Sequence, residues 1–185
     1  MRNSILPKPD YVSWCIEQHA NTNHYYDKYL PYEFHLRMVA QVADQFIRLI
    51  KTDTGTAINF RNAVKKACWG HDLIEDCRVS YNDVKSKLGE EAADIIYAVT
   101  NEKGKSRKER ANDKYYEGIR ETPGAVFVKL CDRIANVQYS KMTKSRMYEV
   151  YRKELDEFIV KLGWDDSNTH PYYAMFSYLV NLFND

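Results

Sequence analysis

The segment at residues 68–77, CWGHDLIEDC, places one histidine and three carboxylates among apolar residues. Successive residues of an α-helix turn by about 100°, so these polar residues would fall within an arc of roughly 140° and share one face. They are His71, Asp72, Glu75 and Asp76. An imidazole nitrogen beside carboxylate oxygens suits a divalent first-row ion such as Mn, Fe, Co, Ni or Zn. The same four residues also fit an exposed polar helix face.

Two residues elsewhere in the chain could complete a metal site. His35 stands at the start of an amphipathic segment, and Asp132 interrupts the apolar segment KLCDRIAN. A buried carboxylate without a partner is costly, so Asp132 is expected to face a cation, and a metal ion would serve. The adjacent Arg133 is expected on another helical face. Taken singly, His35 also fits a surface position or the first turn of a helix.

Apolar residues recur at three- and four-residue steps along most of the chain, which predicts amphipathic helices. The longer stripes cover residues 36–50, 57–74, 125–137, 151–162 and 172–183, and shorter ones end near Gly89 or pass through residues 95–99 and 116–119. The acidic segment would form the C-terminal part of the second stripe. Residues 125–128 alone could be a strand, but the pattern continues too far and favours a helix. The predicted fold is all-α, with about eight helices.

Length and charge limit the functions that the chain can have. A chain of 185 residues suits a single domain, residues 1–185. Its 27 basic and 26 acidic residues give a net charge of +1, so no overall field attracts nucleic acid or an anionic membrane. No run approaches the roughly 18 apolar residues that a membrane span requires. We therefore expect no nucleic-acid partner and no membrane partner.

The cysteines and the aromatic C-terminal segment lead to two further expectations. The four cysteines form no CxxC pair, which favours buried free thiols in a reducing compartment and a cytoplasmic location. The aromatic side chains near the C-terminus could finish the core or form a contact in a homo-oligomer. They are Tyr172, Tyr173, Phe176, Tyr178 and Phe183.

The order of the motifs resembles one family. His35 is followed by HDLIEDC, then by VSYNDVKSKLGEEAADIIYAVTNEKG, and then by AVFVKLCDRIANV. This series resembles the HD superfamily of metal-dependent phosphohydrolases, and most closely the hydrolase domain of the RelA/SpoT family and the small alarmone hydrolases. Those enzymes carry HDxxED and KLxDRxxN motifs, and a Pro-Tyr pair precedes their first histidine ligand, as Pro31-Tyr32 does here. The resemblance spans about residues 15–160.

The resemblance implies a role for each matching residue. One divalent ion, usually manganese in that family, would be bound by four ligands, which are His35, His71, Asp72 and Asp132. Glu75 and Asp76 would orient or deprotonate the attacking water and assist the leaving group. The nucleotide would contact Asn136 near its sugar. Lys129 could contact a phosphate or only extend past apolar surface, and Tyr151 could hold the nucleotide or belong to the core.

The N-terminal part departs from the family pattern. Hydrolases of guanosine tetraphosphate usually have an Arg-Lys pair upstream of the Pro-Tyr pair, where this chain has His24-Tyr25. Both aromatic rings can stack on a base, and Lys28 could supply the missing positive charge. The basic run at residues 103–110 could meet distal phosphates or form an exposed charged loop.

The expected function is metal-dependent hydrolysis of a phosphate ester or anhydride of a nucleotide. The substrate that the resemblance implies is guanosine tetraphosphate, from which pyrophosphate would leave the 3′ position. Two alternatives remain open at this point. The same site could act on a nucleoside monophosphate, NADPH or another phosphoester, or the chain could be a non-catalytic module that senses a nucleotide.

Overall fold

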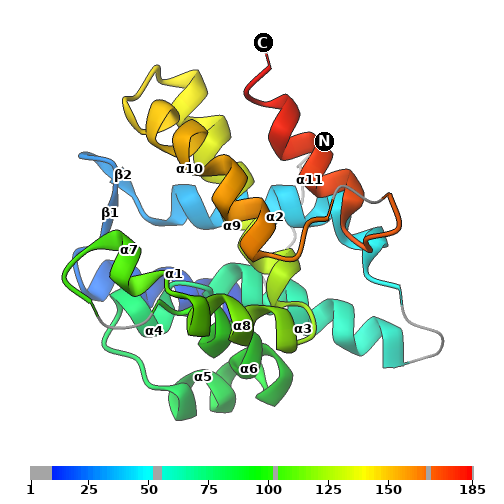
Figure 1. The fold of residues 1–185 in the computed structure, drawn as a ribbon. Coiled ribbons are helices and arrows are strands. Elements are labelled where there is room, and N and C mark those ends of the chain that lie inside the picture. The colour runs from blue at the N-terminus through cyan, green and yellow to red at the C-terminus, as the bar shows by residue number, and fades with distance from the viewer. Residues whose placement is uncertain (1–9, 52–55, 102–103, 166–167, 185) are drawn as a thin grey trace, which may run out of the picture.

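The chain folds into helices over nearly all of the residues that can be described. The structure is a computed structural model, and it describes residues 10–51, 56–101, 104–165 and 168–184. In these ranges nine helices have eight or more residues, which confirms the prediction of an all-α fold (Figure 1). They are α1 (Asp10–Asn21), α2 (Glu33–Phe46), α3 (Thr56–Gly70), α5 (Tyr81–Leu88), α6 (Glu90–Val99), α8 (Asp113–Glu121), α9 (Ala125–Met142), α10 (Met147–Lys161) and α11 (Tyr173–Asn181).

The remaining elements are short. They are the strands β1 (Tyr25–Tyr26) and β2 (Leu30–Pro31), the 3₁₀ helix η1 (Ile47–Leu49), and the single-turn helices α4 (Leu73–Asp76) and α7 (Arg107–Arg110). The two strands pair antiparallel, with Tyr26 opposite Leu30. Neither this hairpin nor α1 was predicted from the sequence. For the hairpin the reason is that two-residue strands are too short to show an alternating pattern.

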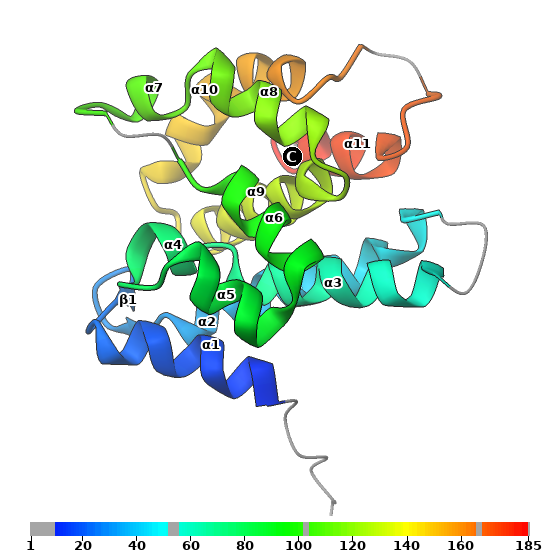
Figure 2. The same ribbon diagram turned by 90° about the horizontal axis from the view of Figure 1, so that it is seen from below.

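Helix α9 lies at the centre of the molecule. It packs against α2, α3, α6, α8, α10 and α11, and in Figure 2 α1 and α2 lie on one side of it and α8 and α10 on the other. A helix with neighbours all around it is apolar on most faces. This explains why residues 125–128 form a continuous apolar run that resembles a buried strand, although they begin a helix of 18 residues.

The second predicted helix is interrupted. The apolar pattern predicted one helix through Ile74, but α3 ends at Gly70 and α4 begins at Leu73, so that prediction was wrong. Gly70 lies in close contact with α5 and α6, because a Cβ atom there would lie 2.8 Å from Ile96 Cδ1 and 2.9 Å from Leu88 Cδ1. A side chain at this position would require these neighbours to shift. Residues 71 and 72 form a turn.

Other predictions about the chain hold in the structure. Cys15, Cys68, Cys77 and Cys131 are all free and buried, as expected. Helix α11 packs on α9 and buries Phe176 completely, which agrees with its predicted role in the core. Across the described residues, no helix combines the length and the apolar character needed to cross a membrane.

Two glycines should respond in opposite ways to substitution. Gly118 lies inside α8 with no atom within 4 Å of a Cβ position, so Gly118→Ala should raise the free energy of unfolding by about 0.5–1 kcal/mol through a less flexible unfolded chain. Gly70→Val should lower it by about 1–3 kcal/mol because the added methyl groups overfill the contact with α5 and α6. Urea unfolding of both variants measures this. Equal effects at the two positions would contradict the packing described for Gly70.

Candidate metal centre

The turn between α3 and α4 sets the position of His71. The His71 ring Nδ1 lies 3.0 Å from the backbone oxygen of Cys68, an oxygen that a continuing helix would have used for the amide of Asp72. With Nδ1 donating to this carbonyl, a neutral His71 carries no proton on Nε2. The turn therefore fixes both the direction of the ring and the nitrogen that can bind a cation. Since α3 stops before His71, the single helical face predicted for the acidic segment does not exist as such.

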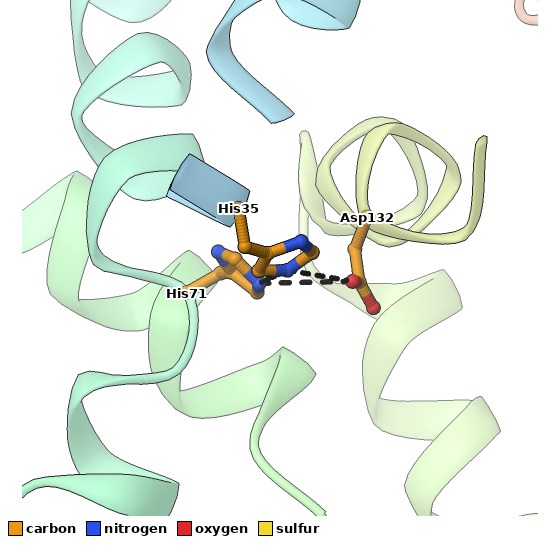
Figure 3. A group of neighbouring side chains, drawn as sticks. All are labelled: His35, His71 and Asp132. Carbon is orange, nitrogen blue, oxygen red and sulfur yellow. Dashed lines mark hydrogen bonds and ion pairs between the residues drawn. The ribbon is translucent and has the colours of Figure 1, made fainter. Parts of the chain in front are cut away.

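Three helical segments distant in sequence bring donor atoms together. His35 of α2 is 1% exposed and His71 is 3% exposed, and their Nε2 atoms lie 3.2 Å apart. Asp132 Oδ1 of α9 lies 3.3 Å from the Nε2 of His35 and 3.7 Å from that of His71. Figure 3 shows the three side chains pointing at one another from separate parts of the chain. Such a group, with its donor atoms all within 4.8 Å of one another, can hold a metal ion.

Asp72 stands beside this group. Its Oδ2 lies 2.8 Å from His71 Nε2 and 3.8 Å from His35 Nε2, and it accepts a hydrogen bond from the hydroxyl of Tyr32. Burial raises the pKa of this hydroxyl well above its usual value, and Asp72 adds to the effect, so Tyr32 remains a donor. Asp72, the fourth residue predicted as a ligand, therefore adjoins both histidines of this group.

The donor set fits a divalent cation. Burial alone would lower the pKa of His71, but Asp72 and Asp132 outweigh it and raise the value to about 9. The two carboxylates thus stabilise a positive charge at this site, even on the buried ring of His71. The two carboxylate oxygens of Asp132 have different partners. Oδ2 pairs with the Lys129 amine at 3.2 Å, and Oδ1 faces the histidines. Lys129 is the cationic partner expected for Asp132. Two imidazole nitrogens with carboxylate oxygens form a donor set that suits first-row divalent ions.

The acidic pair of α4 lies next to the four ligands. Asn101, just after α6, donates from Nδ2 to both carboxylate oxygens of Glu75 at 2.9 Å, which fixes the orientation of Glu75. Asp76 keeps 34% of its side chain exposed. Burial, followed by the charges of Asp72 and Glu75, raises the pKa of Asp76 to about 7. A carboxyl group with this pKa can give up or accept a proton near neutral pH.

These groups line a cavity of about 270 Å³. Three cationic side chains also line it, and they are Arg110, Lys129 and Arg133. Asn136 and Tyr151 line it as well. Asn136 donates from Nδ2 to Asp132 Oδ1 at 2.5 Å and accepts from the Tyr26 hydroxyl at 2.9 Å. A larger open groove of about 840 Å³ between α6 and α8 shares only Asn101 and Tyr115 with this cavity.

The three predicted N-terminal contacts do not line this cavity. Tyr25 is 55% exposed and Lys28 is exposed in the turn of the hairpin. His24 instead stacks on Tyr32, with ring centroids 3.9 Å apart. Tyr26, which the sequence analysis passed over, lies flat against His35 at 4.7 Å. A role in substrate binding for His24, Tyr25 and Lys28 therefore stays a prediction.

Arg133 faces α10, whereas Asp132 faces the histidines, so the two lie on different faces of α9 as expected, although both line the cavity. The long side chain of Arg133 lies over Phe158, 4.1 Å from the ring centroid, and pairs with Glu154 at 2.9 Å. Arg110 was part of the predicted basic run at residues 103–110, of which residue 103 and the side chains of residues 107–108 lie outside the part that the structure describes. Asn101 was missed, although it directly follows the Val-Thr pair that ends α6.

Comparison with known proteins gives relatives of one kind. No family model matches the chain. The guanosine-3′,5′-bis(diphosphate) 3′-pyrophosphohydrolase MESH1 of Danio rerio is 24% identical over 127 residues, which cover 69% of this chain and 65% of the relative. The guanosine-3′,5′-bis(diphosphate) 3′-pyrophosphohydrolase of Aquifex aeolicus is 29% identical over 96 residues, which cover 50% of this chain and 14% of the relative. The chain spans less than two thirds of the length of the curated relatives it matches.

A solved structure shares the fold. It is described as a metazoan ortholog of SpoT that hydrolyses ppGpp and plays a role in starvation responses, and it matches with a TM-score of 0.62 at 18% identity. The match covers 95% of this chain and 97% of the other. The resemblance inferred from the motifs is confirmed, because the similar proteins carry the name of the hydrolase that the motifs indicated.

Removal of one ligand should weaken metal binding selectively. Wild-type protein freed of metal with a chelator should bind one equivalent of a divalent first-row ion, and Asp132→Asn should bind it at least about 100-fold more weakly, because a neutral amide replaces a charged ligand. Asp113→Asn is the matched control, since that carboxylate is 95% exposed and distant from the cluster. Titration calorimetry measures both. Equal affinities in the two variants would contradict the site.

The raised pKa of Asp76 predicts a pH dependence of stability in the metal-free protein. In the unfolded chain this carboxyl releases its proton near pH 4, and in the folded chain near pH 7. Between these values the folded state holds more protons, so the contribution of Asp76 to stability falls as the pH rises. From pH 4 to pH 7 the unfolding free energy of the wild type should therefore fall relative to that of Asp76→Asn. A constant difference would contradict the raised pKa.

Proposed function

We propose that this chain is a metal-dependent phosphohydrolase that acts on guanosine tetraphosphate and releases pyrophosphate from the 3′ position. The observation that carries the proposal is the convergence of His35, His71 and Asp132 beside the acidic pair, in a cavity with three cationic side chains. Relatives that carry the name of this activity support it. They favour this substrate over other phosphoesters and over a non-catalytic sensor.

The metal would be held by four side chains, which are His35, His71, Asp72 and Asp132. A bound divalent ion, for which we propose manganese, would lower the pKa of a water ligand and offset negative charge that develops on the phosphate. The residues around it support this chemistry, because the Cys68 carbonyl and the Tyr32 hydroxyl orient His71 and Asp72. Such outer hydrogen bonds keep metal ligands in place.

Glu75 and Asp76 would carry out the proton transfers. Glu75, held by Asn101, is positioned to orient the attacking water and to accept its proton. Asp76, with a pKa of about 7, is suited to give a proton to the ribose 3′-oxygen, which leaves when the bond to phosphorus breaks. Because one carboxylate is fixed and the other is partly exposed, the two can take different roles.

The remaining cavity residues would bind the nucleotide. Lys129, Arg133 and Arg110 place positive charge on the cavity wall, where it would offset the phosphates in both ground state and transition state. Asn136 would contact the sugar and Tyr151 the nucleoside. The proposal also includes residues 1–185 as a single domain, a cytoplasmic location, and no nucleic-acid or membrane partner.

Hydrolysis assays test this function. Purified protein with Mn²⁺ should release pyrophosphate from guanosine tetra- and pentaphosphate, and Asp72→Asn and Glu75→Gln should lower kcat by about 100-fold or more, in line with the contribution of a positioned acid or base. Glu117→Gln, an exposed position on α8, should leave kcat unchanged. Absence of turnover by wild type, or equal rates in all variants, would overturn the proposal. A panel of nucleoside monophosphates and NADPH in the same assay would reveal another substrate.

A further inference from the structure

His24 lies beside the acidic pair, behind the cavity wall. Its Nε2 lies 3.8 Å from Asp76 Oδ2. Its ring stacks on Tyr32 with an interplanar angle of 20°, and its Nδ1 lies 2.9 Å from Nδ1 of His19. The ring of His24 is therefore held on one face and at one nitrogen, and the other nitrogen points toward Asp76.

The contact with His19 makes His24 adaptable without adding charge. His19 is 1% exposed, and burial lowers its pKa to about 3, so this ring is neutral. Two Nδ1 atoms at 2.9 Å form a hydrogen bond only if one carries a proton and the other does not. If His19 donates, a neutral His24 has its proton on Nε2 and can donate to a carboxylate. If His24 donates, its Nε2 can accept from a carboxylic acid.

We infer that His24 is a positioning residue that holds the side chain of Asp76 against the cavity, and that it does not bind the nucleotide base. This inference rests on the proposed function. The separation of 3.8 Å exceeds a hydrogen bond, but such contacts are often long in a free enzyme and shorten when substrate is bound. One face of the ring is already taken by Tyr32, and His24 does not line the cavity that would hold the nucleotide.

Tyr32 joins this arrangement to the metal ligands. Its hydroxyl donates to Asp72, while its ring carries both His24 and His19, the latter at 4.3 Å. Tyr32 thus positions both Asp72, a predicted ligand, and His24, which lies next to Asp76. A histidine at position 24 fits this support because it combines a flat ring for stacking with two nitrogens for His19 and Asp76.

Kinetics of two variants distinguish positioning from base binding. His24→Phe keeps a ring on Tyr32 but loses both nitrogens, and should lower kcat about tenfold or more with KM within about twofold of wild type. His24→Gln places an amide near the position of Nε2 and should recover kcat to within about threefold of wild type. Tyr29→Phe, on the same hairpin and 85% exposed, is the control and should match wild type.

Three kinetic outcomes would overturn the inference. A raised KM with unchanged kcat in His24→Phe would assign the ring to the nucleotide. Unchanged values in both variants would leave His24 without a role. An equally low kcat in both variants, together with a lowered melting temperature, would show that His24 only contributes to packing. If His24→Phe does not fold, His24→Asn replaces it, because asparagine reaches His19 but is too short for Asp76 and should show the low kcat.

Nuclear magnetic resonance of the wild type tests the histidine pair without turnover. Long-range ¹H–¹⁵N spectra of ¹⁵N-histidine-labelled protein should show one of the two Nδ1 atoms protonated and the other not. Two unprotonated Nδ1 atoms would overturn the arrangement. If wild type hydrolyses no phosphorylated nucleotide, the proposed function fails, and these spectra still decide on the pair. If wild type is active and kcat is insensitive to His24, the inference alone fails.

Discussion

The imidazole rings of His35 and His71 are buried and point their Nε2 atoms at each other across 3.2 Å. Two nitrogens at this distance need a proton or a cation between them, since their lone pairs otherwise repel. Asp132 and Asp72 surround the same point with negative charge, which stabilises either a proton or a metal cation there. Helix packing holds these groups together against their mutual repulsion and desolvation, and the rest of the site follows from this constraint.

Neighbouring groups hold the predicted ligands in position through hydrogen bonds and ion pairs. The carbonyl of Cys68 is released by the end of α3 and orients His71. Lys129 binds one oxygen of Asp132 while the other faces the histidines, and Tyr32 donates to the same oxygen of Asp72 that lies next to His71. Asn101 reaches across from α6 to hold Glu75. The cluster of His35, His71 and Asp132 and the carboxylate of Glu75 are thereby held by contacts from different helices.

Much of this could be predicted from the sequence because it depends on local pattern. The helical stripes follow from the period of apolar residues. The predicted set of ligands, including His35 and Asp132 far from the HD pair, followed from the resemblance of the ordered motifs to one family. The break after Gly70 could not be predicted from the apolar pattern, because that pattern continues without interruption through Ile74. That Arg133 also lines the cavity could not be predicted either, because this depends on Phe158 and Glu154 of α10, against which its side chain lies.

The most direct test of the account is a crystal structure of the protein grown with Mn²⁺, with anomalous diffraction measured near the manganese absorption edge. The account predicts one strong peak at about 2.0–2.3 Å from Nε2 of His35, Nε2 of His71 and an oxygen of Asp132, distances typical of bound first-row metals. A saturated crystal with no peak between these side chains, or with the ion bound elsewhere, would contradict it.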